Sequence, residues 1–242
     1  MRNTRPLWIL LAALLPILGA GCKSRPQGQA TDQDGAFSSY RDIPGITAEE
    51  INALEALKTR KRSGGDRDYF IYGMMPSTET FYNEEGRIEG YSALFCDRLS
   101  ALFGISFKPA LYEWGDLFAG LQSLEIDFTG ELTATEERRS VYFMTDAIAE
   151  HSIKYMRLTG GEELSEIAKK RPLRYVFLGG TTVPSLVTPH LTEDFESFFV
   201  DNNDAVYRML KNGTVDAYFG ENIAEAVFDV YGDVRADDFF PL

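Results

Sequence analysis

The chain has 242 residues, of which 44% are hydrophobic and 13% aromatic, and a formal net charge of −13 at pH 7. A chain of this length and composition can bury a hydrophobic core, whereas its acidity repels phosphate backbones and anionic lipid, so we expect no nucleic-acid partner. Cys22 and Cys96 are the only cysteines, which excludes a disulfide-rich scaffold.

The first 22 residues have the pattern of an export signal. Arg2 and Arg5 precede an apolar run over 7–18, and small residues come directly before Cys22. The run is shorter than the roughly 20 apolar residues of a spanning helix. We therefore predict a lipoprotein signal peptide at 1–21 and an extracytoplasmic protein anchored through a lipidated Cys22. An uncleaved anchor is the alternative, because leucine stands four rather than three positions before the cysteine.

Two segments separate this signal from the main domain. Residues 22–45 are rich in Gly, Pro, Ser, Gln and Asp without periodicity, which is typical of a flexible tether. Residues 46–68 form an N-terminal helix and linker. Thr47 has the position of an N-cap, with Glu50 three residues later completing a capping box.

From residue 69 onward, short apolar runs alternate with amphipathic stretches, which predicts an α/β fold with mostly parallel sheets. Strands are expected at 69–74, 105–111 and 126–129, and helices at 91–103 and 114–121. After an extended connector at 152–158, strands are expected at 174–178, 197–200 and 215–219, and helices after the turn at 179–182, at 205–210 and at 221–228. This organisation predicts two lobes, 69–155 and 156–242, with a cleft between them.

The helix predicted at 91–103 contains Cys96. We expect Cys96 to be a small buried apolar residue and not a reactive thiol. The helical period places four apolar residues toward the sheet: Leu94, Phe95, Leu99 and Leu102.

Five stretches of the main domain share their order and spacing with a known family. They are YGMMPSTETF (72–81), GRIEGY (86–91), YEWGDL (112–117), DFTGELTATEER (127–138) and NGTVDA (212–217). The chain from residue 69 to its end thereby resembles the extracellular solute-binding proteins of the polar amino acid type, family 3, and most closely their sensor-input variants. The resemblance implies a two-lobed type II periplasmic-binding fold, each lobe being a mostly parallel sheet flanked by helices.

The resemblance implies that Thr133 and Arg138 hold a ligand carboxylate. A guanidinium in a desolvated cleft makes two parallel hydrogen bonds to a carboxylate, which a threonine hydroxyl can supplement. The alternative is that Thr135 caps a helix and leaves Arg138 and Arg139 in solvent. Both descriptions can hold together, with Arg138 in the cleft and Arg139 in solvent.

Aromatic walls are the second feature that the resemblance implies. It assigns Phe81 in the first lobe and Trp114 at a helix start to this role, where flat apolar surfaces exclude water and strengthen charged contacts. The alternative for Trp114 is an ordinary core position.

Two acidic residues are candidates for a ligand ammonium group. Glu221 stands where relatives place an aspartate that binds the α-amino group, so this contact is either more distant or replaced; alternatively, Glu221 favours the helix that follows it. Glu131 stands where relatives have a small residue. It selects a ligand with an additional positive charge or forms a salt bridge with Arg138.

In the second lobe, Thr181 and Thr182 open a predicted helix. Free backbone N–H groups there can bind the same carboxylate as Arg138, so a ligand that spans both lobes would stabilise a closed form. The alternative is a plain strand-to-helix turn.

Catalytic and metal-binding patterns are absent from the sequence. His151 and His190 are the only histidines and lack metal-ligand spacing, so both are expected to be structural or surface residues, and no cofactor is expected. An enzyme resembling periplasmic dehydratases would need Glu131 or Glu221 as its general acid.

The expected function is that of a lipid-anchored, extracytoplasmic binding protein for an amino acid or related zwitterion, acting in ABC-type uptake. The alternative is the ligand-sensing input of a membrane signalling protein. Relatives return to the first lobe with a final strand and helix, and this chain stops roughly fifty residues short of such a module. We therefore expect a truncated or partial version.

Overall fold

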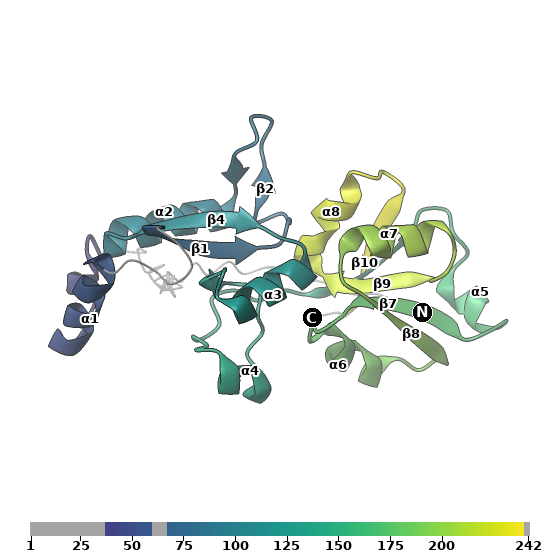
Figure 1. The fold of residues 1–242 in the computed structure, drawn as a ribbon. Helices are drawn as coiled ribbons and strands as arrows, with labels where there is room; N and C mark the ends of the chain where they lie inside the picture. Colours follow the sequence, from purple (N-terminus) through teal and green to yellow (C-terminus); the bar gives the residue numbers. More distant parts are fainter. Residues whose placement is uncertain (1–36, 60–66, 240–242) are drawn as a thin grey trace, which may run out of the picture. The chain divides into compact units, whose positions relative to one another are not determined.

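The computed structural model describes residues 37–59 and 67–239 (Figure 1). The predicted signal peptide and the lipidation at Cys22 lie outside these residues, as does most of the predicted tether. Within the described ranges, no helix has the length and apolar character needed to cross a membrane.

The first described elements are a 3₁₀ turn, η1 (Tyr40–Asp42), and the helix α1 (Ala48–Thr59). The predicted capping box is confirmed. The Thr47 amide and hydroxyl each donate to the Glu50 carboxylate at 2.8 Å, and the Glu50 amide donates to the Thr47 hydroxyl at 3.2 Å. These bonds satisfy amides that the first helical turn leaves without intrahelical partners.

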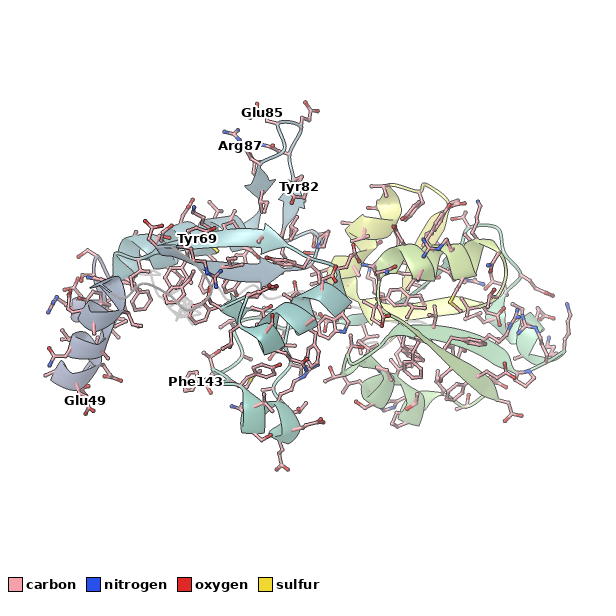
Figure 2. All side chains as sticks on the ribbon, in the orientation of Figure 1. Glu49, Tyr69, Tyr82, Glu85, Arg87 and Phe143 are labelled. Atoms are coloured by element: carbon pink, nitrogen blue, oxygen red, sulfur yellow. The ribbon has the colours of Figure 1, made fainter. Side chains whose placement is uncertain are left out.

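The first sheet contains three parallel strands in the order β4-β1-β5. Tyr69–Met74 (β1) lies between Ser106–Leu111 (β4) and Phe128–Thr129 (β5). A two-stranded hairpin, β2 (Phe81–Tyr82) and β3 (Ile88–Glu89), follows β1 and carries exposed side chains that include Tyr82, Glu85 and Arg87 (Figure 2).

Three helices belong to this part of the chain: α2 (Tyr91–Phe103), α3 (Trp114–Ser123) and α4 (Glu136–Val141). Of the four apolar residues of α2 predicted to face the sheet, Leu94 is 69% exposed and contradicts the prediction, whereas Phe95 packs against the buried cluster and agrees with it. Ser92 and Cys96 are buried. Ser92 and Cys96 stand one helical turn apart, and Cys96 joins Tyr72 and Met74 of β1 in a core cluster. The burial of Cys96 was predicted correctly. Ser92 contacts the turn before β2, where its hydroxyl accepts from the Thr80 hydroxyl at 2.6 Å, and Leu94 faces solvent.

The second sheet contains five strands in the order β10-β6-β9-β7-β8. The parallel strands are β7 (Leu173–Leu178), β8 (Phe195–Val200) and β9 (Ala217–Glu221). The strand β6 (Ile153–Leu158) pairs with β9 in antiparallel fashion, and β10 (Val234–Asp238) pairs with the other edge of β6, also antiparallel. The stretch expected to be a connector, 152–158, is thus largely a paired strand that runs across the predicted lobe boundary.

Short helices connect these strands. They are α5 (Leu164–Ala168), α6 (Val183–Val187), η2 (Thr188–His190), α7 (Asn203–Lys211), η3 (Asn222–Ala224) and α8 (Glu225–Asp229). The prediction omitted α5, β10 and the β2–β3 hairpin. The predicted α/β class, with parallel strands and flanking helices, is confirmed.

Two features position the strands that carry the site. Trp114, Leu117 and Leu121 of α3 share one buried cluster with residues of the second sheet such as Met156 and Val176. At the start of β9, the Asp216 carboxylate receives two bonds from the Arg171 guanidinium, at 2.6 and 2.7 Å, and one from the Arg174 amide at 2.8 Å. A bidentate pair of this kind fixes β9 against β7.

Candidate binding site

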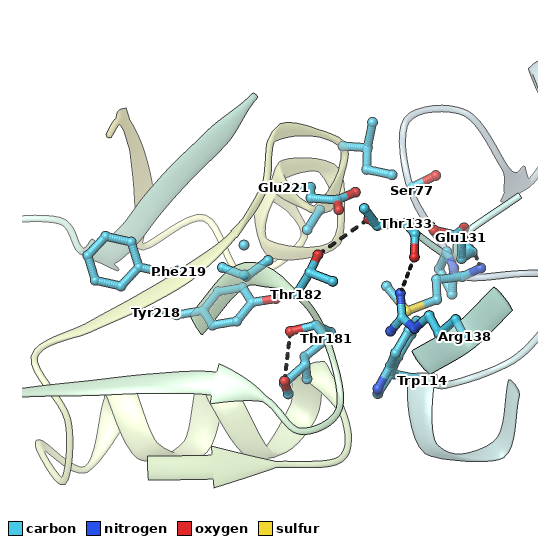
Figure 3. A pocket seen from close by; sticks show the side chains of 17 residues that line it. Ser77, Trp114, Glu131, Thr133, Arg138, Thr181, Thr182, Tyr218, Phe219 and Glu221 are labelled. Atoms are coloured by element: carbon cyan, nitrogen blue, oxygen red, sulfur yellow. Dashed lines mark hydrogen bonds between the residues drawn. The ribbon is translucent and has the colours of Figure 1, made fainter. Parts of the chain in front are cut away.

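A pocket lies where loops and strand ends from both sheets meet (Figure 3). Its wall includes seven of the eight residues that the sequence analysis proposed for ligand binding: Trp114, Glu131, Thr133, Arg138, Thr181, Thr182 and Glu221. Further contributors that the sequence analysis did not identify include Met75, Ser77, Tyr218 and Ile223. The ring of Phe219 points away from the cavity, although the residue is part of its wall (Figure 3).

Arg138 reaches the pocket from the first turn of α4. Thr135 is the N-cap of this helix, and its hydroxyl accepts the Arg138 amide at 3.1 Å. The neighbouring Arg139 is exposed and donates to the Met144 carbonyl at 3.2 Å. The two alternatives of the sequence analysis are therefore compatible, since the same helix start is capped and also presents Arg138 to the cavity.

The Arg138 guanidinium joins the two sides of the pocket. It donates to the Thr133 carbonyl at 2.9 Å and to the Gly180 carbonyl at 2.8 Å. The Thr182 hydroxyl is 3.3 Å from the Thr133 hydroxyl and adds a second link. Gly180 has a φ of +78°, which a residue with a Cβ atom adopts only with strain.

The chemistry of Arg138 suits an anion. Burial lowers its pKa from the ordinary value, but guanidinium groups in proteins remain protonated. A guanidinium has five N–H donors, and the two bonds to carbonyls leave further donors for a ligand.

Trp114 is both a wall of the pocket and a core residue. Its side chain is 5% exposed and belongs to the core cluster around α3. The indole Nε1 donates to the Gly179 carbonyl at 2.5 Å, and the ring stacks on Phe118 with centroids 6.2 Å apart. The two interpretations of Trp114 therefore apply together.

Glu131 provides a carboxyl group whose protonation changes near neutral pH. Burial raises the pKa of Glu131 to about 7, and the nearby carboxylates of Glu221 and Glu79 add to the effect, whereas the bond from the Met75 amide, at 3.0 Å, opposes it. No ion pair between Glu131 and Arg138 forms among the described residues, although the sequence analysis left that alternative open.

Glu221 is the last residue of β9 and contacts a histidine. Its Oε2 lies 2.9 Å from Nδ1 of His151, and the other ring nitrogen, Nε2, lies 3.3 Å from Oε1 of Glu79. Glu79 lies between β1 and β2. Burial opposes the charged form of His151, but the two carboxylates outweigh burial and raise the pKa of His151. The histidine that the sequence analysis regarded as structural or surface-exposed is thus a neighbour of the site.

The structure does not bring Phe81 to this pocket. Phe81 lies in β2, where its side chain is 44% exposed, and the pocket wall contains Ser77 from the preceding turn instead. The turn from Ser77 to Thr80, closed by two backbone hydrogen bonds, directs the chain into the hairpin before Phe81 is reached. The position of Phe81 within a family motif gave no information about this turn, so the motif alone could not predict that Phe81 lies outside the pocket.

The cavity has a volume of about 40 Å³. One water molecule needs roughly 10–15 Å³ of such space, so the pocket holds a few waters and no amino acid. Binding a larger molecule requires a wider cavity than this one.

Chemically, the site combines the guanidinium of Arg138 and the carboxyl groups of Glu131 and Glu221 with several hydroxyls and an aromatic wall. Such a set can bind a molecule that bears both charges. Within the described ranges, no group of three or more His, Cys, Asp or Glu side chains has an arrangement that could hold a metal ion.

Comparison with known proteins identifies the family and the fold. The sequence model of the bacterial extracellular solute-binding proteins, family 3, matches residues 71–221. A search of the curated proteins finds no match.

Solved structures of amino-acid-binding proteins have a similar fold. One is an ancestral arginine-binding protein bound to arginine, with a TM-score of 0.57 at 20% identity over 71% of this chain and 79% of that chain. The ancestral protein bound to glutamine also has a TM-score of 0.57 at 20% identity, over 72% and 80%. A third is the amino acid ABC transporter substrate-binding protein AbpA from Streptococcus pneumoniae Canada MDR_19A bound to L-arginine, with a TM-score of 0.56 at 15% identity over 78% of each chain. These similarities establish the type II periplasmic-binding fold.

Proposed function

The chain belongs to the bacterial extracellular solute-binding proteins, family 3, and from this membership we propose that it binds an amino acid in the pocket around Arg138 and serves ABC-type uptake. One observation carries the proposal: the Arg138 guanidinium and the carboxyl groups of Glu131 and Glu221 line a single cavity. An amino acid bears a carboxylate and an ammonium group, and each is stabilised by an opposite charge.

The carboxylate end of the ligand is assigned to Arg138. When the pocket widens, the bond from Arg138 to the Gly180 carbonyl is free to be replaced by a bond to the ligand. A bidentate guanidinium–carboxylate pair is stronger than a bond to a neutral carbonyl. Thr133 and Thr182, whose hydroxyls already meet across the cavity, supply neutral donors from both sides. The ligand thereby replaces contacts that link the two sides of the empty pocket.

The ammonium end is assigned to Glu221 and Glu131. Both carboxyl groups line the cavity, and Glu131 has a pKa of about 7 because it is buried. An ammonium group beside Glu131 favours the ionised carboxylate and lowers that pKa. Binding of the ligand therefore displaces a proton from Glu131 at neutral pH.

The structural similarity to one transporter component favours a role in uptake over a role in sensing. AbpA, which shares the fold, is a substrate-binding protein of an amino acid ABC transporter. An enzymatic role has less support, because the matched family consists of binding proteins. We therefore assign capture and delivery of the solute, without turnover, to this chain.

The proposal is tested by calorimetry and thermal shift on the purified protein with a panel of amino acids that includes L-arginine and L-glutamine. At least one amino acid is expected to bind with a micromolar Kd, a free energy of about 8 kcal/mol. For the amino acid that binds, the matching amine without its carboxylate is the control, such as agmatine for L-arginine. The amine is expected to bind at least about a hundredfold more weakly, since it cannot form the charged pair with Arg138. A panel without any binding amino acid would contradict the proposal.

We further propose that a lipid on Cys22 anchors the protein outside the cytoplasm, as small residues before this cysteine indicate. The wild-type protein is expected in the membrane fraction, and Cys22→Ser in the soluble fraction or retained as an unprocessed precursor. Mass spectrometry of the N-terminal peptide measures the acyl groups directly. A wild-type protein without acyl groups on Cys22 would exclude the anchor and leave the ligand proposal untouched.

A further inference from the structure

His151 occupies a position between two acidic residues from different parts of the fold. The Glu79 carboxylate comes from the segment between β1 and β2, and the Glu221 carboxylate comes from the end of β9. The imidazole contacts both, at 3.3 Å through Nε2 and at 2.9 Å through Nδ1. His151 is not part of the pocket wall, whereas Glu221 is.

Two carboxylates on one imidazole require a particular protonation state. A neutral imidazole has one N–H group and one acceptor nitrogen, so it can donate to only one ionised carboxylate. The imidazolium form has two N–H groups and can donate to both. The observed contacts therefore describe a bridge that is complete only while His151 carries its second proton.

The backbone around the bridge is held in place independently of it. The Asn222 amide donates to the Ser152 carbonyl at 2.8 Å, and the Thr78 amide donates to the Ile223 carbonyl at 3.3 Å. Next to Glu79, the buried Thr80 hydroxyl donates to the Ser92 hydroxyl at 2.6 Å. Loss of the proton from His151 therefore changes side-chain contacts and local charge, while the backbone segments stay together.

Gly90 also packs against the backbone next to the bridge. It has a φ of +105°, and a Cβ atom at this position would lie 2.3 Å from the Glu79 carbonyl oxygen. The Gly90 backbone thus packs directly against the main chain of Glu79, whose carbonyl also accepts from the Ser92 amide at 3.2 Å.

We propose that His151 is a proton-dependent positioning residue of the binding pocket: as imidazolium it bridges Glu79 and Glu221 and compensates the charge of Glu221, and as neutral imidazole it releases one carboxylate and leaves an uncompensated negative charge beside the ligand. The contact to Glu79 is the longer one, so Glu79 is the carboxylate released. The predicted effect on ligand affinity rests on the proposed function. The bridge between His151, Glu79 and Glu221 is independent of that function.

The direction in which ligand affinity changes with pH depends on the charged groups near this bridge. Besides Glu79 and Glu221, the charge of His151 acts on Glu131, and the charge of Glu221 acts on Arg138. Deprotonation of His151 and of Glu131 each makes the pocket more negative. A ligand ammonium group therefore binds more tightly as the pH rises through the neutral range, and its binding releases protons.

The bridge is tested first without any ligand, by NMR titration of the imidazole resonances. The sequence contains only His151 and His190, so His190→Gln assigns the two signals. The pKa of His151 is expected above its ordinary value of 6.5, and it is expected to fall in Glu79→Gln and again in Glu221→Gln. A His151 signal that titrates at or below the ordinary value, or that neither substitution moves, would overturn the bridge.

The coupling to the pocket is tested by calorimetry across pH 5.5–8.5, with the best-binding amino acid of the panel as the probe and two buffers of different ionisation enthalpy. The wild-type Kd is expected to fall as the pH rises, by up to about tenfold per pH unit for each proton released. His151→Gln is expected to bind the probe, with a shallower slope and fewer protons released, whereas His190→Gln keeps the wild-type slope. An unchanged slope in His151→Gln would overturn the coupling.

The two experiments separate the possible failures. If no amino acid binds any variant at any pH, the proposed function fails, while the NMR titration still decides whether the bridge exists. If an amino acid binds and the NMR titration shows no bridge, this inference fails and the proposed function stands.

Discussion

Arg138→Ala is expected to lose nearly all affinity for the amino acid that the wild-type protein binds. The substitution leaves the ligand carboxylate in the cavity without its charged partner, a change that typically costs about 2–5 kcal/mol and weakens a micromolar Kd toward the millimolar range. Calorimetry at constant pH measures the Kd directly, and a thermal-shift assay shows whether the stabilisation by ligand is lost.

Arg139→Ala is the matched control for this prediction. It removes the same positive charge one residue further along α4, where the side chain is exposed and donates to the Met144 carbonyl. We expect its Kd to stay within about threefold of the wild-type value, because exposed charges contribute little. Arg138→Lys separates charge from geometry, since lysine retains the charge without the two-pronged donor set. Undiminished binding in Arg138→Ala would exclude the proposed carboxylate site.

Trp114→Ala is expected to lower the free energy of unfolding by about 3–5 kcal/mol, the usual cost of truncating a large buried aromatic residue. The Trp114 side chain is 5% exposed and packs in the core cluster with Leu117 and Leu178. Its loss leaves a cavity in that cluster and removes the donor to the Gly179 carbonyl. Urea unfolding followed by circular dichroism measures the change.

Two further substitutions define what Trp114 contributes. Trp114→Phe retains most of the packing and loses the indole N–H, so we expect a smaller cost, about 1–3 kcal/mol for the carbonyl left without its donor. Phe143→Ala is the control for an aromatic residue outside the core, since Phe143 is 95% exposed (Figure 2). Its effect is expected within about 0.5 kcal/mol. Equal costs for Trp114→Ala and Phe143→Ala would contradict the assigned core role.

Several elements were predictable from the sequence because they depend on neighbours close in the chain. The strand at 69–74 and the helix at 91–103 match β1 and α2, since apolar periodicity reflects a regular backbone. The capping box of Thr47 and Glu50 spans three residues and was equally visible. The segment around Arg138 was identifiable for the same reason, because its family motif is contiguous.

The tertiary structure alone decided which side chains meet. Leu94 satisfies the helical period but is exposed, whereas Phe95 and Cys96 of the same helix pack against β1. Phe81 matches a family motif, yet the turn before it leads to an exposed hairpin. Local periodicity defines the backbone form and leaves open which face of an element the fold buries.

The bridge at His151 is the clearest case of this limit. Its partners Glu79 and Glu221 are 72 and 70 residues away in the chain, and an isolated histidine without metal-ligand spacing offers no local pattern. The fold class, the family and the segment that carries Arg138 were all predictable from the sequence. The arrangement of charges around the pocket was decided only when distant segments packed together, because electrostatic contacts depend on distance in space and not on separation along the chain.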